Sequence, residues 1–202
     1  MKIIGLTGPS GAGKGFCYYF FEKSDIPCID TDDVYHKLLV PPSACVDELV
    51  KNFGLEILQK DGTVDRKILA NIVFSDESHQ KLELLNKITH KYVLDKTRSM
   101  LSDYKEAGKV AAVIDAPLLF ESGIDKECDF TVAVISDEDI RIERIMKRDS
   151  ITREAAEMRI RAQKSDDFYT SQATYSVTNN TDISALELQL EAILAKENIS
   201  TD

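Results

Sequence analysis

The stretch KIIGLTGPSGAGKG, residues 2–15, is the most informative part of the sequence about the fold. Its first part, Lys2 to Leu6, is an apolar run that predicts a short strand. The glycine-rich part, residues 8–14, fits the pattern G-x-x-x-x-G-K of a phosphate-binding loop, in which backbone N–H groups and the start of the next helix surround phosphate oxygens. The alternative is a tight glycine turn followed by a solvated lysine. We expect the phosphate-binding loop, because the motif lies directly between a predicted strand and a predicted helix.

Strand-like runs recur beyond this loop, with helical patterns between them. This alternation predicts an α/β fold of three layers, in which a parallel sheet of about five strands is flanked by helices. The runs Ala111 to Ile114 and Val132 to Ile135 are apolar at every position, as expected of strands covered on both faces, so we place them at the centre of the sheet. The predicted strands are Lys2 to Leu6, Pro27 to Asp30, Val110 to Ile114, Thr131 to Ile135 and Ser176 to Thr178.

A long helical segment separates the second and third predicted strands. It contains about 80 residues, which is too many for one crossover helix of ordinary length, and it is interrupted by Pro41, by Gly54 and by the turn signal Asp61-Gly62. Apolar residues at helical spacing between these breaks predict several helices that each bury one face. We therefore expect a helical insert on the nucleotide-binding core.

The charge of the chain is unevenly distributed. Its formal net charge of −10 argues against a general affinity for nucleic acid or an anionic membrane. Between Arg141 and Lys164, however, there are eight Lys or Arg and four Asp or Glu. Such a segment is either a solvated helical face or a lid that closes over a multiply charged anion. We expect a lid at about 145–165, on a single domain with a core of 1–30 and 109–202 and an insert of 31–108.

The overall composition is that of an ordinary globular chain, with 43% hydrophobic and 30% charged residues. The longest apolar runs fall far short of the about 18 residues that a membrane-spanning helix needs, and the first residues have the pattern of a strand rather than of a secretory signal. Four cysteines without paired spacing predict buried thiols, and no histidine is grouped with them as in a zinc site. We expect a cytoplasmic monomer that binds no membrane and no nucleic acid.

Acidic residues follow two of the predicted strands. The run Asp30-Thr31-Asp32-Asp33 follows the second strand, and Asp115 follows the third. Open α/β sheets bind ligands at the carboxyl ends of their strands, so we expect these carboxylates beside the loop. A phosphoryl-transfer enzyme needs a carboxylate to orient and deprotonate the attacking hydroxyl and others to arrange the metal. Alternatively, Thr31 or Asp32 only caps a helix that begins near Val34.

The loop departs from its usual pattern directly after Lys14. The signature ends in Ser or Thr, whose hydroxyl contacts Mg²⁺, but here Gly15 and Phe16 follow. We expect Mg²⁺ to be held by phosphates, water and carboxylates, because this ion keeps much of its hydration shell. The alternative is a loop that binds nucleotide but catalyses poorly.

Several longer motifs occur in a fixed order along the chain: IGLTGPSGAGKG at 4–15, IDTDD at 29–33, DGTVDRKILANIVF at 61–74, ITH at 88–90, DAPLLFESG at 115–123, RIMKRDSIT at 144–152, RIRAQ at 159–163 and Asn179-Asn180. Through these motifs nearly the whole chain resembles the dephospho-CoA kinase family. Enzymes of that family transfer the γ-phosphoryl group of ATP to the ribose 3′-hydroxyl of dephospho-CoA. The resemblance implies a P-loop kinase fold, ATP and Mg²⁺ as cofactors, and dephospho-CoA as the acceptor.

The resemblance also implies roles for residues at matching positions. Asp32 is the second carboxylate of the family's D-x-D and would be the base for the 3′-hydroxyl, and Lys14 would hold the transferring phosphoryl group. Asp115 stands at the family's strand-end aspartate and would organise metal-bound water close to the substrate. Arg144 and Arg148 match arginines that enter the lid, where they would neutralise charge on ATP.

Further positions fall in motifs that the family uses for substrates. Arg66 in VDRK would suit a phosphate of the acceptor, whereas His90 in ITH is equally compatible with a structural role. Asn179 is similar to the family position near adenine, and its alternative is an ordinary turn asparagine. The expected nucleotide-binding residues are Gly11, Ala12, Gly13, Lys14, Gly15, Phe16, Arg144 and Asn179. Weaker candidates, equally compatible with a helical surface, are Arg141, Arg153 and Arg161.

Two other functions remain as alternatives. The sequence GAGKG suggests a nucleoside monophosphate kinase of the adenylate kinase type, although the motifs of the insert argue against this function. Gly15 and Phe16 suggest a nucleotide-binding module that has lost catalysis. We interpret the chain as a dephospho-CoA kinase with reduced, Mg²⁺-dependent activity.

Overall fold

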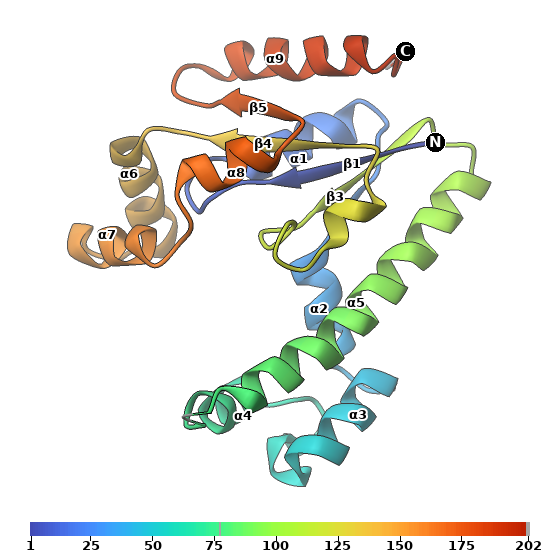
Figure 1. Cartoon of the computed structure of the whole chain (residues 1–202), viewed down its shortest axis with the longest axis vertical. Helices are drawn as coiled ribbons and strands as arrows, with labels where there is room; N and C mark the ends of the chain where they lie inside the picture. Colours follow the sequence, from blue (N-terminus) through green and yellow to red (C-terminus); the bar gives the residue numbers. More distant parts are fainter. Residues whose placement is uncertain (77, 201–202) are drawn as a thin grey trace. The chain divides into compact units, whose positions relative to one another are not determined.

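The computed structural model describes residues 1–76 and 78–200, and Figure 1 shows the chain as a ribbon. Within these residues, five strands form one sheet in the order β2-β3-β1-β4-β5. Each strand agrees with its prediction to within one residue at either end. The strands are β1 (Lys2–Thr7), β2 (Cys28–Asp30), β3 (Ala111–Asp115), β4 (Phe130–Ile135) and β5 (Tyr175–Thr178).

The two all-apolar strands lie at the centre of the sheet, as predicted. Both β3 and β4 pair in parallel with β1, one on each side, and only the last residue of each is not fully buried. The register of β1 and β3 places Leu6 opposite Asp115. The end of β3 therefore lies level with the start of the glycine-rich loop that follows β1.

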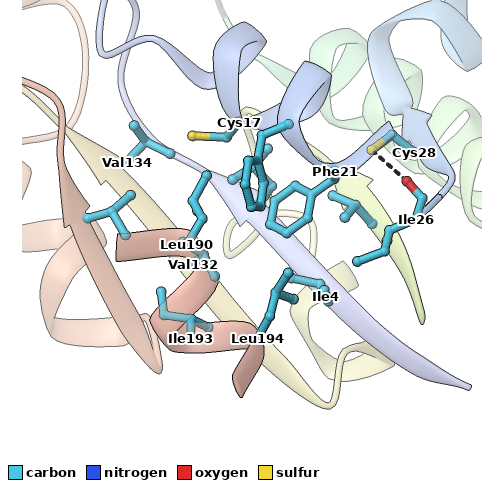
Figure 2. Close-up of a cluster of buried hydrophobic side chains, with 14 of the residues drawn as sticks. Ile4, Cys17, Phe21, Ile26, Cys28, Val132, Val134, Leu190, Ile193 and Leu194 are labelled. Atoms are coloured by element: carbon cyan, nitrogen blue, oxygen red, sulfur yellow. Dashed lines mark hydrogen bonds between the residues drawn. The ribbon is translucent and has the colours of Figure 1, made fainter. Parts of the chain in front are cut away.

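One face of the sheet is covered by α1 (Lys14–Lys23) and α9 (Ile183–Lys196), which contact each other. Figure 2 shows the apolar core between these helices and the strands. Burial of apolar side chains from both helices and from the strands is the main stabilising contribution of such a core. The residues labelled there are Ile4, Cys17, Phe21, Ile26, Cys28, Val132, Val134, Leu190, Ile193 and Leu194.

The opposite face is covered by the segment that follows β3 and by α8 (Asp166–Gln172). A side chain at Gly5 would approach Leu119 Cδ2 and Cys128 Sγ to 2.9 Å, so this segment, which includes η2 (Ile124–Glu127), packs directly on the backbone of β1. Neighbouring residues of a strand point to opposite faces, so Gly5 faces away from the core of Figure 2. Covered faces on both sides make the three layers that were predicted.

The basic segment forms a pair of helices with a small core of their own. Helices α6 (Glu138–Asp149) and α7 (Arg153–Arg161) pack through Ile142 and Ile145 on the first and Ala156 and Ile160 on the second. Thr152 caps α7 by accepting a hydrogen bond from the amide of Ala155. The apolar stripe of each helix faces the other helix, which leaves their basic side chains on the remaining faces.

Residues 30–102 form a second compact unit, while residues 1–29 and 103–202 form the first. The second unit has its own core, to which Leu49, Leu69 and Ile88 contribute. The predicted breaks at Pro41, Gly54 and Asp61-Gly62 all fall between its helices. These are α2 (Thr31–Leu38), α3 (Ala44–Phe53), η1 (Leu55–Ile57), α4 (Arg66–Phe74) and α5 (Gln80–Glu106), which ends in the first unit.

The helices of the described residues differ in length and in apolar character, the two requirements of a membrane-spanning helix. The longest, α5, has 27 residues, but it carries many charged side chains. Across residues 1–76 and 78–200, no helix combines the length and the apolar character needed to cross a bilayer.

All four cysteines are free thiols. Cys17, Cys28 and Cys45 are buried as predicted, whereas Cys128 is half-buried. Burial raises the pKa of the Cys17 thiol to about 12, so this side chain stays neutral and packs like a small apolar residue.

Truncation of a core residue on α9 should destabilise the protein far more than the same change on its exposed face. Leu190 is 1% exposed and Leu188 is 65% exposed on the same helix. We expect Leu190→Ala to lower the free energy of unfolding by about 2–5 kcal/mol and Leu188→Ala to change it by at most about 0.5 kcal/mol. Urea denaturation measures both, and equal midpoints would contradict the packing in Figure 2.

Candidate active site

The loop between β1 and α1 depends on its glycines. Gly8, Gly11 and Gly13 have φ angles of +142°, +81° and +101°, which side-chain-bearing residues rarely adopt. Space is equally restrictive, because a Cβ atom would lie 2.2 Å from the carbonyl oxygen of Val134 at Gly8 and 2.0 Å from Nδ2 of Asn179 at Gly13. The motif therefore forms the close-packed curved backbone that a phosphate-binding loop requires.

The first turn of α1 follows this loop directly. Gly13 is its N-cap and contributes no side-chain hydrogen bond, and the first turn contains no acidic residue. A helix start of this kind attracts anions through its N–H groups and its dipole. The arrangement is that of a phosphate site.

Gly15 and Phe16, the two unusual residues of the motif, have different surroundings. A Cβ atom at Gly15 would have no atom within 4 Å, so the space for a hydroxyl-bearing side chain exists but is not used. The Phe16 ring packs against the core of Figure 2, and its amide donates to the carbonyl of Gly13. Any contribution of Phe16 to nucleotide binding therefore comes from its backbone.

Lys14 and Asp115 lie together, although 100 residues separate them in the sequence. Lys14 Nζ is 3.7 Å from Oδ1 of Asp115, and the two side chains are 17% and 13% exposed. Lys14 begins α1 and Asp115 ends β3, and the register of β3 with β1 brings these ends to the same level. A cation and a carboxylate thus lie beside the loop, as the motifs predicted.

Arg144 and Asn179, both predicted to bind nucleotide, contact the backbone of the loop. Arg144 Nη1 donates to the carbonyls of Gly11 and Ala12, each at 3.3 Å. Asn179 Nδ2 donates to the carbonyl of Ala12 at 2.8 Å, and the residue is buried. Both side chains therefore donate hydrogen bonds to carbonyl groups of the loop backbone.

Three residues of the basic segment contact Ser10 at the tip of the loop. The Ser10 amide donates to Oε1 of Gln163 at 3.0 Å, and its carbonyl accepts from Nε of Arg141 at 3.1 Å. Its hydroxyl accepts from Nη2 of Arg148 at 3.2 Å. Ser10 and Gln163 were not among the predicted site residues. The available signals were the loop motif, which contains Ser10, and the motif RIRAQ, which ends in Gln163.

The weaker arginine candidates fall into two classes. The Arg141 side chain is only 5% exposed and pairs with Asp166 Oδ1 at 3.0 Å, so it is an internal anchor rather than a helical surface residue. Arg153 and Arg161 lie on the surface, where both pair with Glu157. Ion pairs of this exposed kind contribute little to stability.

Arg148 is held by its neighbour in sequence. Its Nε and Nη2 donate to the two carboxylate oxygens of Asp149 at 2.8 and 2.9 Å, and Arg159 pairs with the same carboxylate. Hydrogen bonds from Arg148 hold the pKa of the Asp149 carboxyl below its ordinary value. The Arg148 guanidinium therefore lies next to the loop and is held in a geometry that can bind two oxygens of an anion.

Three predicted site residues belong to the second compact unit, residues 30–102. Asp32 is exposed in the first turn of α2, Arg66 is the first residue of α4, and His90 is half-buried in α5. Burial lowers the pKa of His90 below its ordinary value, which favours the neutral imidazole.

The alternative in which Thr31 or Asp32 caps α2 is wrong. The helix begins at Thr31, three residues earlier than expected, and the cap is Asp30, whose Oδ1 accepts from the amides of Asp32 and Asp33 at 2.9 and 3.2 Å. A run of consecutive residues that all make good caps does not reveal from sequence which one is used. The capping role therefore falls to Asp30 and not to Asp32.

The donor set beside the loop fits a magnesium ion that is bound mainly by its nucleotide. Within the described residues no group of three or more His, Cys, Asp or Glu side chains forms a metal site. Asp115 supplies one carboxylate, and Gly15 supplies no hydroxyl. Mg²⁺ commonly binds through one or two carboxylates, substrate phosphates and retained waters. The residues described beside the loop supply one carboxylate, which is the smallest number of protein ligands in that range.

Substitution of Gly13 should be far more damaging than the same substitution of Gly15. Gly13→Ala would place a Cβ atom 2.0 Å from Asn179 Nδ2 at a φ of +101°, and the left-handed conformation alone costs about 1–2 kcal/mol. Gly15→Ala meets open space in a helical turn, where alanine is favoured by about 0.5–1 kcal/mol. Thermal melting separates the two variants, and equal melting temperatures would show that the close contact at Gly13 is unimportant.

Comparison with known proteins supports the family resemblance that the sequence motifs indicated. The dephospho-CoA kinase family model matches residues 2–185. A dephospho-CoA kinase of Lactobacillus johnsonii is 36% identical over 192 residues, 95% of this chain and 96% of that protein. The structure of TT1252 from Thermus thermophilus is similar with a TM-score of 0.78 at 28% identity, over 96% of this chain and 97% of the other.

A second solved structure supports the fold. The dephospho-CoA kinase from Campylobacter jejuni has a TM-score of 0.71 at 23% identity, and the match covers 98% of both chains. These comparisons do not favour the nucleoside monophosphate kinase alternative. The chain belongs to the dephospho-CoA kinase family and is a P-loop kinase, a phosphotransferase that uses ATP to phosphorylate dephospho-CoA in coenzyme A biosynthesis.

Proposed function

We propose that residues 11–16 bind the phosphates of ATP, with Lys14 on the transferring phosphoryl group and Asp115 beside it. The observation that carries this proposal is the 3.7 Å approach of Lys14 to Asp115 next to the glycine loop. A phosphoryl group entering the loop meets the N–H groups of the helix start and the ammonium group of Lys14. These positive groups offset the charge on the equatorial oxygens of the transferring group.

Asp32 is proposed as the base for the acceptor hydroxyl. Its support is its place two residues beyond β2, in the family's D-x-D motif, together with the finding that Asp30 provides the cap of α2. The carboxylate accepts the proton of the ribose 3′-hydroxyl while that oxygen bonds to the γ-phosphorus. The bond from the γ-phosphorus to the bridging oxygen breaks, and ADP leaves.

Magnesium, when bound with ATP, would offset the charge on the β- and γ-phosphates. Asp115 is the residue proposed to hold it, through water, because no hydroxyl follows Lys14 in this loop. The same carboxylate orients the ammonium group of Lys14. Asp115 is therefore proposed both to hold Mg²⁺ through water and to orient Lys14. In the usual signature, the Ser or Thr hydroxyl would also contact Mg²⁺.

Arg148 is proposed to act from the lid, at about 145–165. Its support is the hydrogen bond from Nη2 to Ser10 Oγ, which links the guanidinium to the loop. In this proposal a phosphate oxygen replaces part of the Asp149 carboxylate as its partner, and Arg144 acts next to it. Arginine suits such an exchange because its planar fork binds carboxylates and phosphates with the same geometry.

The second compact unit, residues 30–102, is proposed to bind dephospho-CoA. Arg66 would contact an acceptor phosphate and His90 would line the site as a neutral imidazole. Since the loop, Lys14 and Asp115 all come from one chain, we propose a monomer as the working unit. Four free thiols support a reducing compartment such as the cytoplasm.

The purified protein should form coenzyme A and ADP from dephospho-CoA and ATP, and chelation of Mg²⁺ should stop the reaction. AMP and CMP, offered as competing acceptors, should not be phosphorylated at a comparable rate. A coupled ADP assay with separation of the products measures all three acceptors. Preference for AMP or CMP, or tight ATP binding without turnover at high enzyme concentration, would contradict the proposal.

Asp32→Asn should lower kcat by about 10²–10⁴-fold, because an amide cannot accept the proton of the hydroxyl. The KM for ATP should change little, since Asp32 is proposed to act on the acceptor. Asp33→Asn is a matched control: Asp33 is the adjacent carboxylate in the same turn and pairs with Lys37 at 2.7 Å on the surface. Steady-state kinetics of both variants decide the assignment, and similar kcat values would assign the base elsewhere.

A further inference from the structure

Asn179 lies at the end of β5, and its backbone is fixed on both sides. Its amide donates to the carbonyl of Ile135 at 2.9 Å and so continues the ladder between β4 and β5. Its carbonyl accepts from Ser136 Oγ at 2.9 Å and from Arg144 Nη2 at 3.0 Å. Only 8% of the residue is exposed. Its side chain therefore starts from a rigid position in the sheet.

From this position the carboxamide of Asn179 reaches the phosphate loop. Nδ2 donates to the carbonyl of Ala12 at 2.8 Å, and Oδ1 accepts from Arg144 Nη2 at 3.4 Å. These partners determine the orientation of the amide, since a carbonyl oxygen needs a donor and a guanidinium needs an acceptor. The approach is so close that a Cβ atom at residue 13 would lie 2.0 Å from Nδ2. Glycine at residue 13 thus makes room for this contact.

The contact with Ala12 determines the direction of an N–H group. The carbonyl of Ala12 and the amide of Gly13 belong to one planar trans peptide, in which C=O and N–H point in opposite directions. A carbonyl that is held at Asn179 therefore turns the Gly13 N–H away from Asn179. If this peptide rotated, a carbonyl oxygen would face the incoming phosphate and repel it.

We propose that Asn179 is a positioning residue that fixes the Ala12–Gly13 peptide of the loop, so that the N–H of Gly13 points at a phosphate of the nucleotide. Asn179 acts through the loop and not through the base. This inference rests on the proposed binding of ATP phosphates by residues 11–16. It predicts that removal of the amide donor weakens binding of any polyphosphate, with or without a nucleoside.

Asn179→Asp removes the donor with almost no change of shape, and Asn180→Asp is the matched control. Oδ1 of Asn180 accepts from the amide of Asp137 at 2.8 Å, and a carboxylate keeps that contact. The dissociation constants of ATP and of inorganic tripolyphosphate are measured for each variant by calorimetry. We expect Asn179→Asp to weaken both ligands by a similar factor of about tenfold or more, and Asn180→Asp to change both by less than about twofold.

Asn179→Ala, which removes the amide donor and adds no charge, separates loss of the donor from charge repulsion and serves if the aspartate variant does not fold. It should also weaken ATP and tripolyphosphate by similar factors, with a cooperative thermal transition retained. Weakened ATP binding with unchanged tripolyphosphate binding would overturn the inference in favour of a contact with the base. Unchanged binding of both ligands would overturn it as well. Failure of the unaltered protein to bind tripolyphosphate would instead refute the proposed role of the loop, and the inference with it.

Discussion

A loop that turns its N–H groups towards an anion must place its carbonyl groups elsewhere, and these buried carbonyls need donors of their own. In this protein the donors come from the C-terminal half of the chain. Arg144 and Asn179 bind the carbonyls of Gly11 and Ala12, and Arg141 binds that of Ser10. The sheet order, which places β4 beside β1 and β5 beside β4, brings these donors to the loop.

Much of this architecture could be predicted because local sequence patterns indicate the strands and the loop. Strand-like runs marked all five strands to within one residue, and the apolar runs of β3 and β4 correctly indicated strands covered on both faces. The spacing of Gly8, Gly13 and Lys14 identified the loop, because only glycine tolerates its backbone angles and close contacts. Strand-end position was enough to place Asp115 near Lys14.

The parts that sequence did not predict depend on contacts between distant residues. Asn179 and Ala12 are 167 positions apart, and Gln163 and Ser10 are 153 apart, so no periodicity connects them. The resemblance suggested a substrate contact for Asn179 and Arg144, but not the loop carbonyls that they bind. The cap at Asp30 was missed for a different reason, because four successive residues were all suitable caps. The proposed base, Asp32, rests on its motif.

Ser10 is held through its amide, its carbonyl and its hydroxyl, and every one of these contacts comes from the segment that carries α6, α7 and their flanking residues. A movement of the loop tip must either break these bonds or take Arg141, Arg148 and Gln163 along with it. The segment and the loop are consequently connected at Ser10, in addition to the hydrogen bonds of Arg144 with Gly11 and Ala12. Filling of the loop by nucleotide would therefore act on the arginine-bearing helices through these contacts.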